Sequence, residues 1–101
     1  MDTCKTGTVT CTTPATALTI TMGFRPAAVF VFNVSDTGTL WWSRTLTDAH
    51  GHRSVGSTGE ETAISEKGIT PLDNGFIIGV DTEINGQTDV LHWIAWRGEA
   101  V

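Results

Sequence analysis

Hydrophobic and polar residues alternate along this chain in short runs, and no run keeps the 3.6-residue period of an amphipathic helix. In residues 16–22, Leu18, Ile20 and Met22 face one way and threonines face the other, which predicts a half-buried strand. Residues 28–34 read AVFVFNV and are apolar on both faces. A run of that kind indicates a central strand, covered on two sides or packed in the core on one face and against a neighbouring subunit on the other.

The clearest turn signal lies in residues 73–96. Two apolar runs, 76–80 and 90–96, flank Asn85-Gly86, a dipeptide that tolerates positive φ at both turn positions. The sequence therefore predicts an antiparallel hairpin built from these two runs. Both faces of its second strand are largely apolar, with Val90, His92, Ile94 and Trp96 on one and Leu91, Trp93 and Ala95 on the other.

The middle of the chain is less regular. Residues 40–44 predict a strand that sends Trp41 and Trp42 to opposite faces, one into the core and one towards solvent. Residues 45–59 predict a long loop with a short strand near 53–55, and the helix-like stretch 60–68 is interpreted as loop or one turn because it is too short to be stable alone. About seven short antiparallel strands at ten-residue spacing predict an all-β fold, a β-sandwich of jelly-roll type.

With 101 residues, the chain predicts a single domain over 1–101. Residues 1–13 are interpreted as an N-terminal arm or as a hairpin turning at Gly7, which would bring Cys4 and Cys11 face to face. We favour reduced thiols, since two cysteines do not make a disulfide framework.

Charge and composition exclude several classes of protein. The net charge of -5 and the four scattered arginines predict that the chain does not bind nucleic acid. Neither a targeting segment nor an apolar run long enough for a bilayer is present in the sequence, which predicts a soluble, cytosolically made protein without a membrane partner.

Few residue patterns point to catalytic or metal chemistry. Asp48, His50 and His52 stand at alternate positions, where a strand would place three metal ligands on one side. Their glycine-containing, polar context favours a solvated loop, so we expect no metal and no cofactor. Scattered carboxylates and the absence of GxSxG, CxxC, Walker and GxGxxG patterns predict no catalytic residues and no enzymatic activity.

The four tryptophans leave two interpretations open. Exposed indoles could stack on sugar rings, and Trp41 and Trp42 are the candidate carbohydrate-binding residues, although core or subunit-interface packing is the favoured interpretation for this pair. For Trp93 and Trp96 core or subunit-interface packing is favoured as well. The residues expected at an assembly interface are Trp93, Trp96, Val29, Val31 and Phe30.

The order of several short motifs resembles a module found in bacteriophage structural proteins. The motifs are GFRPAAV at 23–29, Leu46-Thr47-Asp48 with Gly51, NGFIIG at 74–79, Asn85-Gly86 and HWIAW at 92–96, and the module has the form GFxPxxV…NGFxxG…N…G…HWxAF. The similarity extends over about residues 16–96. Trp96 stands where the pattern has Phe, and the segment 53–70 is short.

This resemblance implies a β-sandwich virion protein that lacks catalytic residues. A free-standing acidic module of this size is similar to a head decoration or cement protein, which sits on the capsid lattice as a trimer and clamps neighbouring capsid subunits. The implied partners are the major capsid protein or another virion protein, and further copies of the chain. The implied alternative is a tail fibre or tail-associated module that recognises host surface carbohydrate.

Overall fold

The computed structural model describes residues 4–98, which contain eight β-strands and no helix. Within that range no helix has the length and apolar character needed to cross a membrane. The strands, in chain order, are β1 (Cys4–Thr10), β2 (Leu18–Thr21), β3 (Pro26–Asn33), β4 (Thr39–Ser43), β5 (His50–Ser54), β6 (Glu61–Leu72), β7 (Gly75–Ile78) and β8 (Val90–Arg97).

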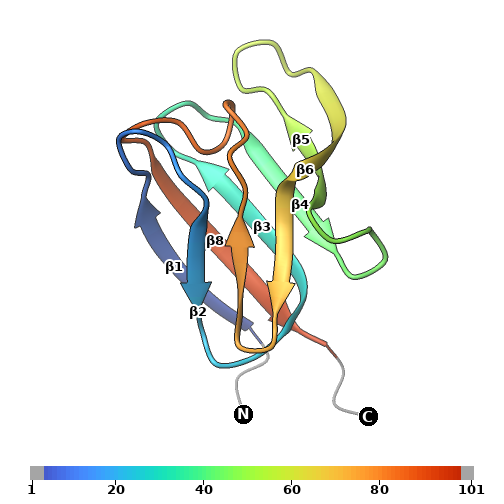
Figure 1. Ribbon diagram of the computed structural model, residues 1–101. Coiled ribbons are helices and arrows are strands. Elements are labelled where there is room, and N and C mark those ends of the chain that lie inside the picture. Colours follow the sequence, from blue (N-terminus) through green and yellow to red (C-terminus); the bar gives the residue numbers. More distant parts are fainter. Residues whose placement is uncertain (1–3, 99–101) are drawn as a thin grey trace.

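All eight strands belong to one antiparallel sheet with the order β1-β8-β3-β4-β5-β6-β7-β2 (Figure 1). The predicted all-β class is confirmed, with one strand more than expected. Because a single continuous sheet replaces two separate ones, the finer sandwich and jelly-roll assignment is not confirmed. β1 and β2 form the two edges, and each pairs with one neighbour only.

The sheet curls around its own core. Phe76 on β7 and Trp93 on β8 are separated by four strands in the sheet order, yet their rings meet edge to face at 5.4 Å. Such contact is possible only if the two parts of the sheet bend towards each other, as the curved shape in Figure 1 shows. The concave side carries the core, and its largest fully buried apolar side chains are Trp42, Phe76, Leu40, Ile69, Ile78, Ile84, Leu91, Val29 and Val31.

The predicted hairpin between residues 76–80 and 90–96 is wrong. β7 pairs with β6 and β2, whereas β8 pairs with β1 and β3, so the two strands lie on opposite sides of the core. Neither Asn85 nor Gly86 has a positive φ; that conformation occurs at Thr88, with φ of 63°. Asn85 is instead a buried residue whose side-chain amide donates to Thr16 O at 2.8 Å and Gly79 O at 3.2 Å.

The interpretation of residues 60–68 as loop or one turn is also wrong. This segment forms most of β6, the longest strand, and its Thr62 and Ile64 are half-buried while Glu61 and Ala63 are exposed. Pairing with β5 therefore outweighs the helix-favouring composition. β6 contains a bulge at residues 65–68, because His50 pairs with Ile69 while the next residue, Gly51, pairs with Ile64. Glu66, inside this bulge, has a positive φ of 68°. β5 at His50–Ser54 replaces the shorter strand expected near 53–55.

Gly7 is not a turn. It lies in the middle of β1 opposite Trp93, and β1 pairs along its whole length with β8, so the expected hairpin at Gly7 is wrong and the segment is no free arm. A Cβ at Gly7 would lie 2.6 Å from the Trp93 ring, so the glycine makes room for that indole. Residues 1–3 of the predicted arm lie outside the described residues. Cys4 and Cys11 are free thiols, the first exposed and the second buried.

The two thiols are expected to react at very different rates in the native protein. Burial, reinforced by the charge of Asp89, raises the pKa of Cys11, and the thiolate is the form that attacks a disulfide reagent. Titration with an aromatic disulfide reagent at pH 8 should therefore show one fast thiol, Cys4, and a second only after unfolding in urea. Because folding keeps Cys11 protonated, its contribution lowers the free energy of unfolding as the pH rises above the ordinary value of 9.0.

Cys4→Ser is the control for this titration. It should remove the fast phase and leave the slow one unchanged. Two equally fast thiols in the native protein would contradict the burial of Cys11.

Candidate functional site

The convex side of the sheet carries a row of large apolar side chains. Ile94 on β8 is directly opposite Phe30 on β3, and Phe30 is directly opposite Trp41 on β4. Residues directly opposite in an antiparallel pair share a face, so these three side chains adjoin on three neighbouring strands. Trp96 lies on the same face of β8, two residues further along. We call Phe30, Trp41, Ile94 and Trp96 the outer apolar patch.

This patch remains accessible to a partner. Trp41 is 44% exposed and Trp96 is 42% exposed, while Phe30 and Ile94 are half-buried. Val90 and Val34, also exposed, extend the apolar surface at the far end of β8, where the backbone N–H of Val34 donates to Val90 O at 3.0 Å. Exposed apolar side chains gathered on one face are typical of a surface that contacts another molecule.

The predicted interface residues divide between the two faces of the sheet. Trp96 and Phe30 are on the convex face, where Trp96 is exposed and Phe30 is half-buried. Val29, Val31 and Trp93 are in the core, and the two valines are essentially inaccessible. Assigning these three to an interface is therefore wrong, because alternation along β3 and β8 turns them to the concave side. The structure adds Trp41 and Ile94 to the surface.

Trp41 and Trp42 point to opposite faces, as predicted. Trp42 is 1% exposed, and its indole Nε1–H donates to Thr47 O at 3.2 Å. A side chain so completely buried presents no ring face to a sugar, so the candidate role of Trp42 in carbohydrate binding is wrong and the favoured core packing holds for it. Trp41 alone is exposed, and its ring lies 5.8 Å from that of His52, tilted by 44°.

The residues considered as metal ligands make other contacts. His52 Nε2 lies 2.9 Å from Oε1 of Glu61, and His50 Nδ1 lies 3.1 Å from the backbone oxygen of Asp48. Across residues 4–98, no group of three or more His, Cys, Asp and Glu side chains is placed to hold a metal ion. His52 and Glu61 instead make a polar border beside Trp41.

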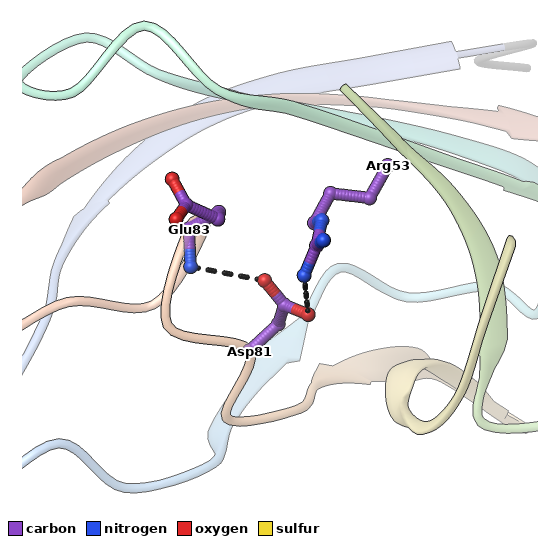
Figure 2. Close-up of polar contacts among 3 residues, drawn as sticks. All are labelled: Arg53, Asp81 and Glu83. Carbon is purple, nitrogen blue, oxygen red and sulfur yellow. Dashed lines mark hydrogen bonds and ion pairs between the residues drawn. The ribbon is translucent and has the colours of Figure 1, made fainter. Parts of the chain in front are cut away.

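One end of the curled sheet is closed by the connection between β7 and β8, residues 79–89 (Figure 1). Its anchor is Asp81, whose carboxylate Oδ2 accepts from Arg53 Nη1 at 2.9 Å and whose Oδ1 accepts from the backbone N–H of Glu83 at 3.0 Å (Figure 2). The Asp81 side chain is 5% exposed and that of Arg53 is 20% exposed. This shielded ion pair fixes the connection to β5.

A second buried group ties the same connection to β3. Asn33 donates from Nδ2 to Ile84 O and to Asp89 Oδ2, both at 2.8 Å, and its Oδ1 accepts from the N–H of Asp36. Asn33 and Ile84 are both fully buried. The sequence offered no signal for these roles, because the partners are 51 and 56 residues apart.

Known proteins offer no further guide to the site. Comparison with protein-family models, with curated proteins and with solved structures finds no match to this chain. The assignment of the outer apolar patch as the candidate site therefore depends on strand pairing and exposure alone.

Proposed function

We propose that this protein is a bacteriophage virion structural protein, a capsid decoration or cement protein that acts through contacts and not through catalysis. The observation that carries the proposal is the outer apolar patch on the convex face of the sheet. The phage-module resemblance supports the same conclusion, and the proposed partners are the major capsid protein and further copies of the chain, arranged as a trimer.

Two features of the sheet support this role. First, the patch spans three neighbouring strands of one sheet, so the backbone that carries its side chains is already ordered before binding. Second, the edges β1 and β2 leave one side of each strand without a strand neighbour, and an open edge can accept a strand from another chain. Aromatic side chains such as Trp41 and Trp96 are typical anchors of protein interfaces.

Purified virions and capsids provide the test. The protein is expected to be present in virions, to bind expanded capsids that lack it at a fixed copy number, and to raise the temperature at which they rupture. Trp41→Ala should weaken capsid binding at least about thirtyfold, since truncating an interface anchor costs about 2 kcal/mol or more. Cryo-electron microscopy locates the bound copies, and light scattering measures the oligomeric state.

Gln87→Ala is the matched control, because Gln87 is exposed on the connection between β7 and β8 and is not part of the patch. It should bind capsids like the unmodified protein. Absence of the protein from purified virions would overturn the proposal, and so would equal binding by both variants and the parent.

The second candidate is a tail-associated module that recognises host surface carbohydrate. The exposed Trp41 ring with His52 and Glu61 beside it favours this alternative, because an indole face and neighbouring polar groups suit a sugar ring. A tail module should appear on virion tails and, as isolated protein, should bind specific glycans on an array. A decoration protein should instead bind capsids and show no binding to the glycan array.

A further inference from the structure

A cleft of about 520 Å³ lies at the end of the sheet opposite the connection between β7 and β8. Its walls come from segments that are distant in sequence: the loop between β2 and β3, the residues after β4, the turn between β6 and β7, and the end of β8. In Figure 1 the β2–β3 loop, the β6–β7 turn and the end of β8 meet at the bottom of the view. The volume is in the range of small-molecule sites.

Three arginines line this cleft: Arg25, Arg44 and Arg97. They are half of the six Lys and Arg residues in a chain whose net charge is -5. The guanidinium carbon of Arg97 lies 5.7 Å from the centre of the Phe24 ring, a cation–π arrangement that restrains the side chain. The Arg44 side chain packs against Gly98, since a Cβ on Gly98 would lie 2.6 Å from Arg44 Nη1. The fold therefore concentrates positive charge that the sequence disperses.

Two of these guanidinium groups have no carboxylate partner among residues 4–98. Arg25 is 3.6 Å from Asp73, but both side chains are well exposed and such a pair is weak. Neither Arg44 nor Arg97 lies within salt-bridge distance of a described carboxylate. Among the described lining residues, three arginines and two aspartates, Asp48 and Asp73, give a formal charge of +1 (3 − 2).

We propose that this cleft binds the carboxylate of an acidic sugar, a monosaccharide unit of the uronic-acid type. A guanidinium presents planar paired donors that match a carboxylate, so Arg44 and Arg97 hold the anionic group. The carboxylates of Asp48 and Asp73 accept hydrogen bonds from the sugar hydroxyls. A monoanion matches the local charge of +1.

The two aspartates decide between an acidic sugar and an acidic peptide. The carboxylate of either ligand meets the same repulsion from Asp48 and Asp73, but an Asp or Glu side chain has no hydroxyl donors to offer these two carboxylates. A sugar acid supplies hydroxyl donors to the same carboxylates. The lining thus provides donors and acceptors together, which suits a ligand that carries one negative charge and several hydroxyl groups.

This site is separate from the outer apolar patch. Apart from Trp42, which is on the concave side, the cleft residues come from the ends of strands and from loops, and none belongs to the patch. Loss of capsid binding and loss of sugar binding can therefore be distinguished, since each proposal has its own variants and its own assay.

Titration of the full chain with D-glucuronate, followed by ¹⁵N–¹H correlation spectra, tests the proposal. Saturable shifts are expected for the backbone amides of residues 23–25, 44 and 98 and for the indole N–H of Trp42. D-Glucose, acetate and inorganic phosphate are the comparison ligands, and each should bind at least about tenfold more weakly because each lacks either the carboxylate or the hydroxyl groups.

Arg44→Gln and Arg97→Gln should each weaken glucuronate binding about tenfold, since each removes charge-assisted hydrogen bonds. Lys5→Gln, which removes one positive charge outside the cleft, should leave the affinity unchanged. Preserved amide dispersion in every variant shows that the fold is intact. No saturable shift with glucuronate, equal binding of phosphate or acetate, preferential binding of a glutamate-rich peptide, or an equal effect of Lys5→Gln would each overturn the proposal.

Discussion

Trp93→Ala is expected to lower the free energy of unfolding by about 3–5 kcal/mol, the cost typical of truncating a large buried aromatic side chain. Trp93 is 8% exposed, meets Phe76 edge to face and covers Gly7. Its removal leaves a cavity between β8 and β7, which are not neighbours in the sheet and face each other across the core. Urea denaturation followed by far-ultraviolet circular dichroism measures the change without relying on tryptophan fluorescence.

Trp96→Ala is the matched control, three residues further along β8 and on the convex face. With 42% of the side chain already exposed, its truncation should cost the monomer about 1 kcal/mol or less. The same variant should reduce capsid binding, because Trp96 belongs to the outer apolar patch. Equal losses of monomer stability in both variants would contradict the assignment of these residues to opposite faces.

Asp81→Ala should also destabilise the protein strongly, by about 3–5 kcal/mol, because it leaves a largely buried arginine without its counter-ion. Arg53 Nε already lacks a hydrogen-bond partner within residues 4–98, so the bond from Nη1 to Asp81 is the main compensation for burying the charge. The variant also removes the acceptor of the Glu83 N–H. Urea denaturation again gives the change, and amide exchange should accelerate most in residues 79–89.

Asp73→Ala provides the comparison for an exposed ion pair. Asp73 lies 3.6 Å from Arg25 and is fully exposed, so its removal should leave the urea midpoint unchanged. If Asp81→Ala proved as mild as Asp73→Ala, the buried Arg53–Asp81 pair would not be what anchors the connection between β7 and β8.

Local sequence patterns predicted most of the strands but not their partners. Alternation located β2, β3 and β4 and correctly separated Trp41 from Trp42, because side-chain direction depends only on neighbouring residues. The same rule would have placed Val29, Val31 and Trp93 on the core side if the buried face had been known. Pairing is a long-range property, and the Asn85-Gly86 signal therefore suggested a hairpin that does not form.

Other features had no sequence signal strong enough to reveal them. β6 contains Glu, Ala and Lys residues that favour helix, and its identity as a strand depends on the presence of β5 and β7 on either side. The arginines of the cleft are 19 and 53 positions apart along the chain, and scattered spacing led to the expectation that they do not cluster. They come together because the β2–β3 loop, the residues after β4 and the end of β8 lie at the same end of the folded sheet.

The position of β8 in the sheet order has a consequence for how the chain folds. β8 lies between β1, the first described strand, and β3, so β1 has no strand partner until residues 90–97 have been synthesised. Pairing between elements so far apart in sequence gives a high contact order, which is associated with slow folding. During translation the threonine-rich β1 therefore stays without its strand partner until residues 80 to 92 positions further along the chain have emerged.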